Sequence, residues 1–100
     1  MKTEIGKYKL ENMLSYKGTN NYVPNQFVIT IDTDKGRKRI FQSYDKTIAV
    51  KSENGNVTLD TNNWDYSATT LHYLNNFLCE SVKEIRKKIR NGEYKFANLN

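Results

Sequence analysis

The stretch from Ser67 to Asn91 constrains the fold more than any other part of this chain, because it alone has sustained helical periodicity. Its apolar residues recur every three or four positions and so lie on one face of an α-helix: Leu71, Leu74, Leu78, Val82, Ile85 and Ile89. Ser67 suits the N-cap position, and Asn91-Gly92 suits the end of the helix. We expect one continuous helix over residues 67–91.

The preceding segment, residues 26–60, predicts antiparallel strands. Phe27, Ile29 and Ile31 alternate with Val28, Thr30 and Asp32, which is typical of a half-buried strand. A turn over residues 32–36 leads into a second strand at 37–44, and a third strand follows at 47–51. Asn54-Gly55 favours a two-residue hairpin turn, and counting outward from it pairs Val50 with Leu59 on the buried face.

The two ends of the chain carry weaker patterns. Residues 7–10 alternate like a strand, residues 12–16 suit either a second short strand or a helical turn, and residues 93–100 suggest a short docking tail. We expect a single domain over residues 1–100 with an α+β fold. In this fold an antiparallel β-meander of about four strands packs on one long C-terminal helix, because no other large apolar surface could cover the meander.

Composition and charge limit the function classes. The net charge of +5 permits binding to nucleic acid or to an acidic protein surface, without requiring either. The one cysteine, Cys79, excludes an internal disulfide and a cysteine-based zinc site. No apolar run approaches the roughly 20 residues that span a bilayer, and the N-terminus lacks the apolar region of a signal peptide. We therefore expect a soluble, cytoplasmic protein without a membrane partner.

A basic run near the end of the helix is the first candidate binding site. Its cations fall at helical spacings that form a stripe beside the apolar face: Lys83, Arg86, Lys87 and Arg90. Such a stripe is typical of phosphate contacts in nucleic-acid binders. The alternative is a solvated helix flank, since Glu80 and Glu84 lie within reach of its lysines.

A second basic group, Arg37, Lys38 and Arg39, begins the second expected strand. These charges either protect a strand edge from pairing or join the helical stripe in one patch. Tyrosine is enriched at protein interfaces, and we expect Tyr16, Tyr22 and Tyr44 to be exposed, with Tyr44 as a candidate partner-binding residue.

The sequence shows no pattern that identifies a chemistry. His72 is the one histidine, and neither a glycine-rich phosphate loop, a pair of catalytic carboxylates nor a metal-ligand cluster occurs. We expect no cofactor, no metal and no catalytic residue, and so a protein that is not an enzyme.

The order of several short motifs resembles a family of small uncharacterised proteins of phages, plasmids and other mobile elements of Gram-positive bacteria. The motifs fall within residues 14–92: Asn25-Gln26-Phe27, Phe41-Gln42-Ser43-Tyr44, Ile48-Ala49, Trp64-Asp65-Tyr66-Ser67 with Thr69-Thr70, Tyr73, and Phe77-Leu78. The resemblance transfers no catalytic residue. It implies a factor that acts against a host defence, with anti-CRISPR proteins as a class of this size.

Three functional hypotheses follow. The leading one is a non-enzymatic binding protein that inhibits a host defence factor, most plausibly a CRISPR effector nuclease, by contacting the nuclease or its guide RNA. The alternative is a small basic regulator that binds nucleic acid through Arg86, Arg90 and the Arg37–Arg39 group. The third is a toxin-like ribonuclease, in which Lys, Arg and Tyr would replace the usual histidines.

Overall fold

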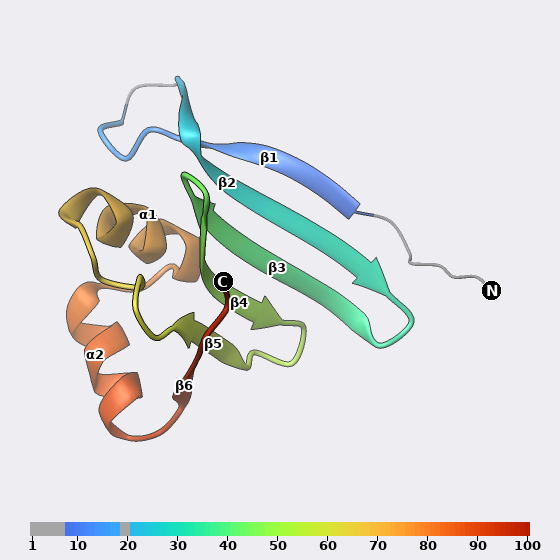
Figure 1. Cartoon of the computed structure of the whole chain (residues 1–100), viewed down its shortest axis with the longest axis vertical. Helices are drawn as coiled ribbons and strands as arrows, with labels where there is room; N and C mark the ends of the chain where they lie inside the picture. Colours follow the sequence, from blue (N-terminus) through green and yellow to red (C-terminus); the bar gives the residue numbers. More distant parts are fainter. Residues whose placement is uncertain (1–7, 19–20) are drawn as a thin grey trace.

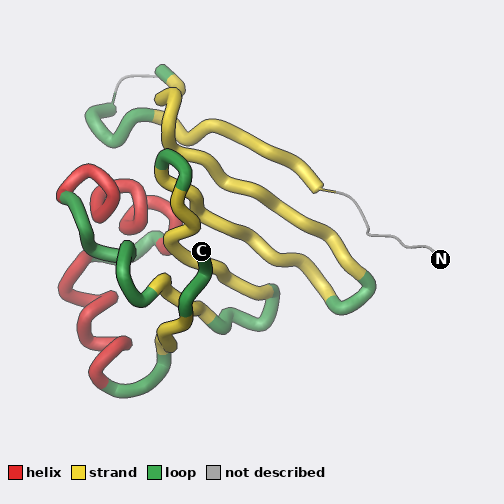
Figure 2. The backbone as a smooth tube through the Cα atoms, viewed as in Figure 1, coloured by secondary structure: helices red, strands yellow, loops and turns green. Residues whose placement is uncertain are grey.

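A computed structural model describes residues 8–18 and 21–100. These residues form one six-stranded sheet and two helices (Figures 1 and 2). In chain order the elements are β1 (Tyr8–Leu14), β2 (Tyr22–Thr33), β3 (Gly36–Ser43), β4 (Lys46–Ser52), β5 (Val57–Asp60), α1 (Ala68–Leu78), α2 (Val82–Arg90) and β6 (Tyr94–Ala97). The strands lie in the order of the sequence, antiparallel from β1 to β5, and β6 then pairs with β5 in parallel. The sheet is therefore mixed, and α1 and α2 form the connection that a parallel pair requires.

The expectation of a four-stranded meander on one long helix is wrong. The sheet has two further strands, β1 and β6, and the expected helix divides at residues 79–81 into α1 and α2. Cys79 ends α1 in the left-handed region with φ 57°, and Ser81 begins α2 as its N-cap. Ser81 and Glu84 form a capping box, in which each side chain accepts the backbone N–H of the other residue. This local motif starts a new helix, although the apolar spacing continues across the break.

The termini of the expected helix are otherwise confirmed. The Ser67 side chain accepts the N–H of Thr70 at 3.1 Å, and α2 ends at Arg90 before Asn91 and Gly92. At the other end of the chain, the strand expected over residues 7–10 belongs to β1, which continues to Leu14, whereas Lys7 lies outside the described residues. The expected tail forms β6 followed by a segment that bonds to Asp60 and Thr47.

The β4–β5 hairpin differs from its expected register by one residue. Ala49, not Val50, lies opposite Leu59, and Val50 pairs with Thr58. The turn holds three residues rather than two: Gly55 donates to the Ser52 carbonyl and takes φ 92°, while Ser52 pairs with Asn56. This is a type I turn followed by a glycine bulge, the usual alternative for an Asn-Gly sequence.

The hydrophobic core lies between the helices and one face of the sheet. Its most buried members come from both layers: Phe41, Ile48, Ala49 and Leu59 from strands, and Leu74 and Ile85 from helices. Ile48 and Ala49 are neighbours in sequence yet both are buried, because β4 has an irregularity opposite Phe41 and Gln42 that places one extra residue in the strand. The helices cover only part of the sheet, and β1, β2 and β3 extend beyond them (Figure 1).

Candidate binding surface

The sheet face that is turned away from the helices is apolar. Strand pairing places Leu10, Ile29, Ile40 and Val50 side by side across β1 to β4. Tyr8 and Ile31 form a second row, and Phe27 belongs to a third. We call these seven residues the open face: Tyr8, Leu10, Phe27, Ile29, Ile31, Ile40 and Val50.

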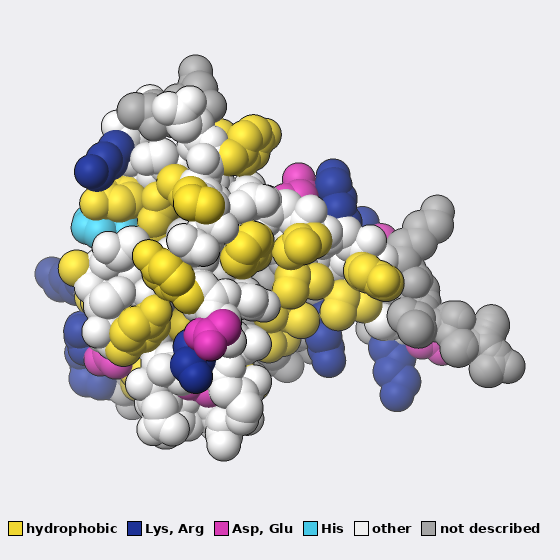
Figure 3. Space-filling view, turned by 45° about the horizontal axis from the view of Figure 1, so that its top comes forward, with side chains coloured by type: hydrophobic (Ala, Val, Ile, Leu, Met, Phe, Trp, Pro, Cys, Tyr) yellow, Lys and Arg dark blue, Asp and Glu magenta, His cyan; other side chains and the backbone are white. Residues whose placement is uncertain are grey.

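The open face is accessible to solvent among the described residues. Tyr8 is 72% exposed and Leu10 is 61% exposed, while the remaining five are half-buried by their strand neighbours. Figure 3 shows hydrophobic side chains gathered over this part of the sheet. Scattered apolar residues on a surface are normal, whereas a contiguous apolar patch is a candidate interaction site.

The burial of β2 explains how the open face arises. The helix-covered face of this strand carries Gln26 and Val28, which are 3% and 7% exposed. Phe27, Ile29 and Ile31 therefore point away from the core, although they form the more apolar set of the alternation. The helices cover the face of β2 that carries Val28, and the described chain supplies no cover for the face that carries Phe27, Ile29 and Ile31.

Charge on the open face is sparse and basic. Across the three rows of β1 to β4, Lys38 is the one charged side chain, opposite Ile31 and Ser52. The reverse side of the same protruding strands is polar and carries Lys9, Glu11, Asp32, Arg37 and Arg39. The projecting part of the sheet is thus apolar on one side and charged on the other.

The three cations expected at the start of β3 do not form a patch. Arg37 forms an ion pair with Asp32 at 2.6 Å, and this hydrogen bond raises the pKa of Arg37. The Arg39 guanidinium lies 5.3 Å from the centre of the Phe77 ring. Because strand residues alternate, Lys38 alone points to the open face.

The four cations of the basic stripe, Lys83, Arg86, Lys87 and Arg90, lie on α2. In Figure 1, α2 lies on the opposite side of the molecule from the β2–β3 turn. The Arg86 guanidinium lies 5.3 Å from the centre of the Trp64 ring. Lys83, Lys87 and Arg90 are exposed and form no ion pair with any described residue. The structure therefore does not join α2 and the Arg37–Arg39 group into one surface.

The exposure of the three tyrosines is confirmed: Tyr16, Tyr22 and Tyr44 all lie at the surface. Tyr44 occupies the first position of the two-residue β3–β4 turn, with φ 56°, and its N–H donates to the Asn25 carbonyl at 2.7 Å. Tyr16 stacks on His72, with ring centres 4.2 Å apart. His72 therefore has an aromatic packing contact.

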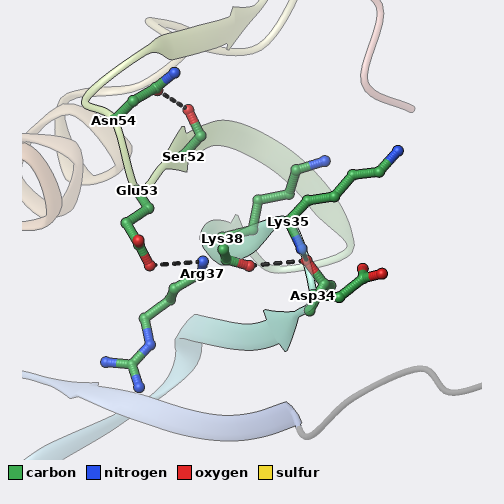
Figure 4. A pocket seen from close by; sticks show the side chains of 9 residues that line it. Asp34, Lys35, Arg37, Lys38, Ser52, Glu53 and Asn54 are labelled. Atoms are coloured by element: carbon green, nitrogen blue, oxygen red, sulfur yellow. Dashed lines mark hydrogen bonds between the residues drawn. The ribbon is translucent and has the colours of Figure 1, made fainter.

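A hollow of about 590 Å³ lies between the β2–β3 and β4–β5 turns (Figure 4). Glu53 closes one side by accepting the N–H of Arg37 at 3.0 Å. Lys35 and Lys38 extend along the other side with Asp34 nearby (Figure 4). The side chains that line the hollow are mostly exposed and include both basic and acidic groups. They therefore give no ligand a specific set of contacts.

Glu80, Lys88 and Tyr94 form a polar cluster at the junction of α1 and α2, which the sequence analysis did not predict. Glu80 accepts hydrogen bonds from the Lys88 ammonium and from the Tyr94 hydroxyl. Burial, together with the neighbouring Glu80 carboxylate, raises the pKa of Tyr94, and the bond to Glu80 raises the pKa of Lys88. These contacts tie the α1–α2 junction to β6, which is a structural role.

Within the described ranges, no group of three or more His, Cys, Asp or Glu side chains is arranged to hold a metal ion. The same residues include no helix that is long and apolar enough to cross a membrane.

Comparison with known proteins yields one match. A family model described as a family of unknown function (DUF8033) matches residues 8–93. No curated protein and no solved structure matches the chain.

Proposed function

The chain belongs to DUF8033, a family of unknown function, and we propose from the open face that it is a non-enzymatic protein that binds another protein. The observation that carries the proposal is the row of Leu10, Ile29, Ile40 and Val50, which lies across four strands without a cover from the described chain.

The size of the open face suits a protein partner. Four strands spaced ~4.8 Å apart, over five residues that each rise ~3.4 Å, give a flat footprint of roughly 300 Å². That is within the range of functional apolar patches, but below the ~800 Å² that each partner buries in a standard interface. We therefore propose that the contact also includes Leu14 and Tyr22, an exposed pair at the end of β1 and β2.

The chemistry of the open face also favours protein over nucleic acid. Nucleic-acid surfaces need many cations to neutralise phosphates, and this face offers one, Lys38. Apolar and aromatic side chains with few charges are typical of the centre of a protein interface.

For the target, we propose a host defence factor in the cytoplasm, with a CRISPR effector nuclease as the first candidate. The support for this choice is the resemblance of the motifs in residues 14–92 to proteins of mobile elements. The open face supports binding as such and does not select among protein targets.

The test uses purified guide-loaded CRISPR effector nucleases from Gram-positive hosts, with binding measured by interferometry and DNA cleavage followed in parallel. We expect stoichiometric binding that tolerates salt, and loss of more than about 90% of the affinity in Ile29→Lys, since a buried unpaired charge costs several kcal/mol. The matched control is Thr30→Lys, on the reverse side of the same strand. If both variants bind equally well, the partner does not bind through the open face. If the protein binds none of the effectors, the proposed target is wrong.

The basic stripe supports a second candidate, a nucleic-acid contact on α2. Lys83, Lys87 and Arg90 lack an ion pair with any residue that the structure describes. If they bind phosphates, affinity for DNA or RNA should fall steeply with salt, and replacing all three by Ala should lower the salt slope by about 2–3. No retention on nucleic acid at low salt would contradict this function.

A further inference from the structure

The outer edge of the sheet carries a second surface, distinct from the open face. In the described sheet β1 is an edge strand of seven residues, and six of them are exposed. An edge strand presents unpaired backbone N–H and C=O groups, which can pair with a strand of another chain.

The register of the sheet shows which backbone groups face this edge. Thr33 and Gly36 close a two-residue turn and therefore form a hydrogen-bonded pair, after which bonded and non-bonded pairs alternate along β2 and β3. The Tyr44 N–H bond to the Asn25 carbonyl agrees with this alternation. Ile29 and Ile31 thus bond to β3, whereas Val28 and Thr30 bond to β1.

The same alternation fixes the orientation of β1. Glu11 lies opposite Val28 and Lys9 opposite Thr30, so these two residues bond inward to β2. Tyr8, Leu10 and Asn12 therefore direct their backbone N–H and C=O groups outward to the free edge.

We propose that β1 pairs with β1 of a second copy of this chain, antiparallel about a two-fold axis at Leu10. In this arrangement Leu10 lies opposite Leu10 of the second copy, and Tyr8 lies opposite Asn12. Each of these outward-directed pairs exchanges two N–H···O bonds, as hydrogen-bonded antiparallel pairs do. A two-fold axis makes the interface self-complementary, so every contact occurs twice.

Charge selects this register. With the axis at Leu10, Lys9 of each copy lies opposite Glu11 of the other, on the polar side of the sheet. Both side chains are exposed, and within one chain they already lie 3.5 Å apart. Moving the axis to Lys9 would oppose two lysines, and moving it to Glu11 would oppose two carboxylates, and directly opposed like charges are destabilising.

The result is a continuous sheet in which the open faces of the two copies adjoin on one side. The row from Leu10 to Val50 continues across the axis into the second copy. This inference does not rest on the proposed function, because the edge of β1 and the open face are different surfaces.

The test is sedimentation equilibrium of the full chain at low ionic strength, where we expect a species of twice the 11.7 kDa monomer. Lys9→Glu and Glu11→Lys should each raise the dimer Kd about tenfold, because each opposes like charges on both sides of the axis. An equimolar mixture of the two variants should restore association, since the acidic edge of one then faces the basic edge of the other.

Three results would overturn the inference: a monomer at all concentrations, variants that dimerise as the wild type does, or a mixture that associates no better than its components. Ile29→Lys provides the control for stacking through the open face, and it should leave the dimer intact. If Ile29→Lys abolished association, the two copies would contact each other through the open face, and pairing at β1 would be wrong.

Discussion

Two non-glycine residues of the described chain adopt a left-handed backbone, Tyr44 and Cys79. Cys79 ends α1, where this conformation is common, but Tyr44 occupies a tight turn with a bulky exposed side chain. Such a conformation costs about 1–2 kcal/mol for a residue with a Cβ. Strain of this kind is often retained at functional sites, and Tyr44 stays a predicted partner-binding residue.

Replacing Tyr44 by Asn should therefore stabilise the fold. Asn tolerates positive φ, and the lost side chain is more than half exposed, so we expect the free energy of unfolding to rise by about 0.5–1 kcal/mol. Urea unfolding measures this change. Asp45→Asn in the same turn is the control and should have little effect on the free energy of unfolding. If Tyr44→Asn were less stable than the wild type, the positive φ of Tyr44 would not be a source of strain.

Asp60 gives the stability a defined dependence on pH. Burial alone would raise the pKa of this carboxyl, but hydrogen bonds from the backbone and side chains of the C-terminal segment and the following turn hold it below its usual value. Among these donors are the Leu99 N–H at 2.8 Å and the Asn63 amide at 2.6 Å. The ionised form is therefore the one that anchors the C-terminal segment to β5.

The sign of the pH effect follows from the lowered pKa. The contribution of Asp60 should be fully present above about pH 4, the ordinary pKa of the unfolded chain, and should be lost as the pH falls through the lower folded value. Asp60→Asn should reduce stability at pH 7 and make the urea midpoint less dependent on pH between 5 and 2. An unchanged dependence would show that Asp60 does not anchor the tail.

At the scale of elements, the break between α1 and α2 decides how the helices cover the sheet. The capping box of Ser81 and Glu84 satisfies N–H groups at the start of α2, and Glu80 connects the junction to β6 through Tyr94. A straight helix would place Ile85 and Ile89 on the line of α1. The break instead allows Ile85 to be fully buried in the core.

The capping box can be tested by variants that remove or retain it. Ser81→Ala should lower the free energy of unfolding by about 1 kcal/mol, the usual cost of losing a helix N-cap. Glu84→Gln retains the hydrogen-bonding pattern of the box but loses the charge, whereas Glu84→Ala removes both, so the second should lower the thermal midpoint more. Equal midpoints for Gln and Ala would mean that the Glu84 side chain does not contribute.

The elements differ in how far sequence could predict them. Periodicity identified Leu74, Leu78 and Ile85, which are buried, but it missed Tyr73 and Phe77, which are buried as well. Ser67 and Asn91-Gly92 marked the outer helix ends, since these signals are local. The internal break had a signal too, the Ser-x-x-Glu pattern at residues 81–84, but continuous apolar spacing outweighed it. Asn54-Gly55 located the β4–β5 hairpin, yet two turn types accept this dipeptide and they differ by one residue in register.

The candidate site was harder to predict because it depends on tertiary packing. Phe27, Ile29 and Ile31 have the alternation of a strand, and alternation cannot say which face the helices cover. The parallel strand β6 depends on the crossover through both helices, which no local pattern in residues 94–97 encodes. The sequence left open whether the Arg37–Arg39 group protects a strand edge or joins α2 in one patch, because sequence does not place separate elements in space.

At the scale of the whole molecule, the sheet is wider than the two helices can cover. One face of the protruding strands is charged and suits water, while the other is apolar, as in a sheet that packs against a second layer. We propose that a partner protein supplies that second layer. At the edge of the sheet, we propose that β1 pairs with β1 of a second copy of the chain.

The measurement that tests this account most directly is methyl NMR with a soluble paramagnetic probe, which detects side chains in contact with solvent and needs no partner. We predict strong relaxation enhancement for the methyl groups of Leu10, Ile29, Ile40 and Val50, in the monomer and in a dimer paired at β1 alike. Ile48, Leu74 and Ile85 are fully buried and provide the internal reference. Methyl groups of the open face as protected as those of Ile48 would contradict the account, because the face would then be covered in the free protein.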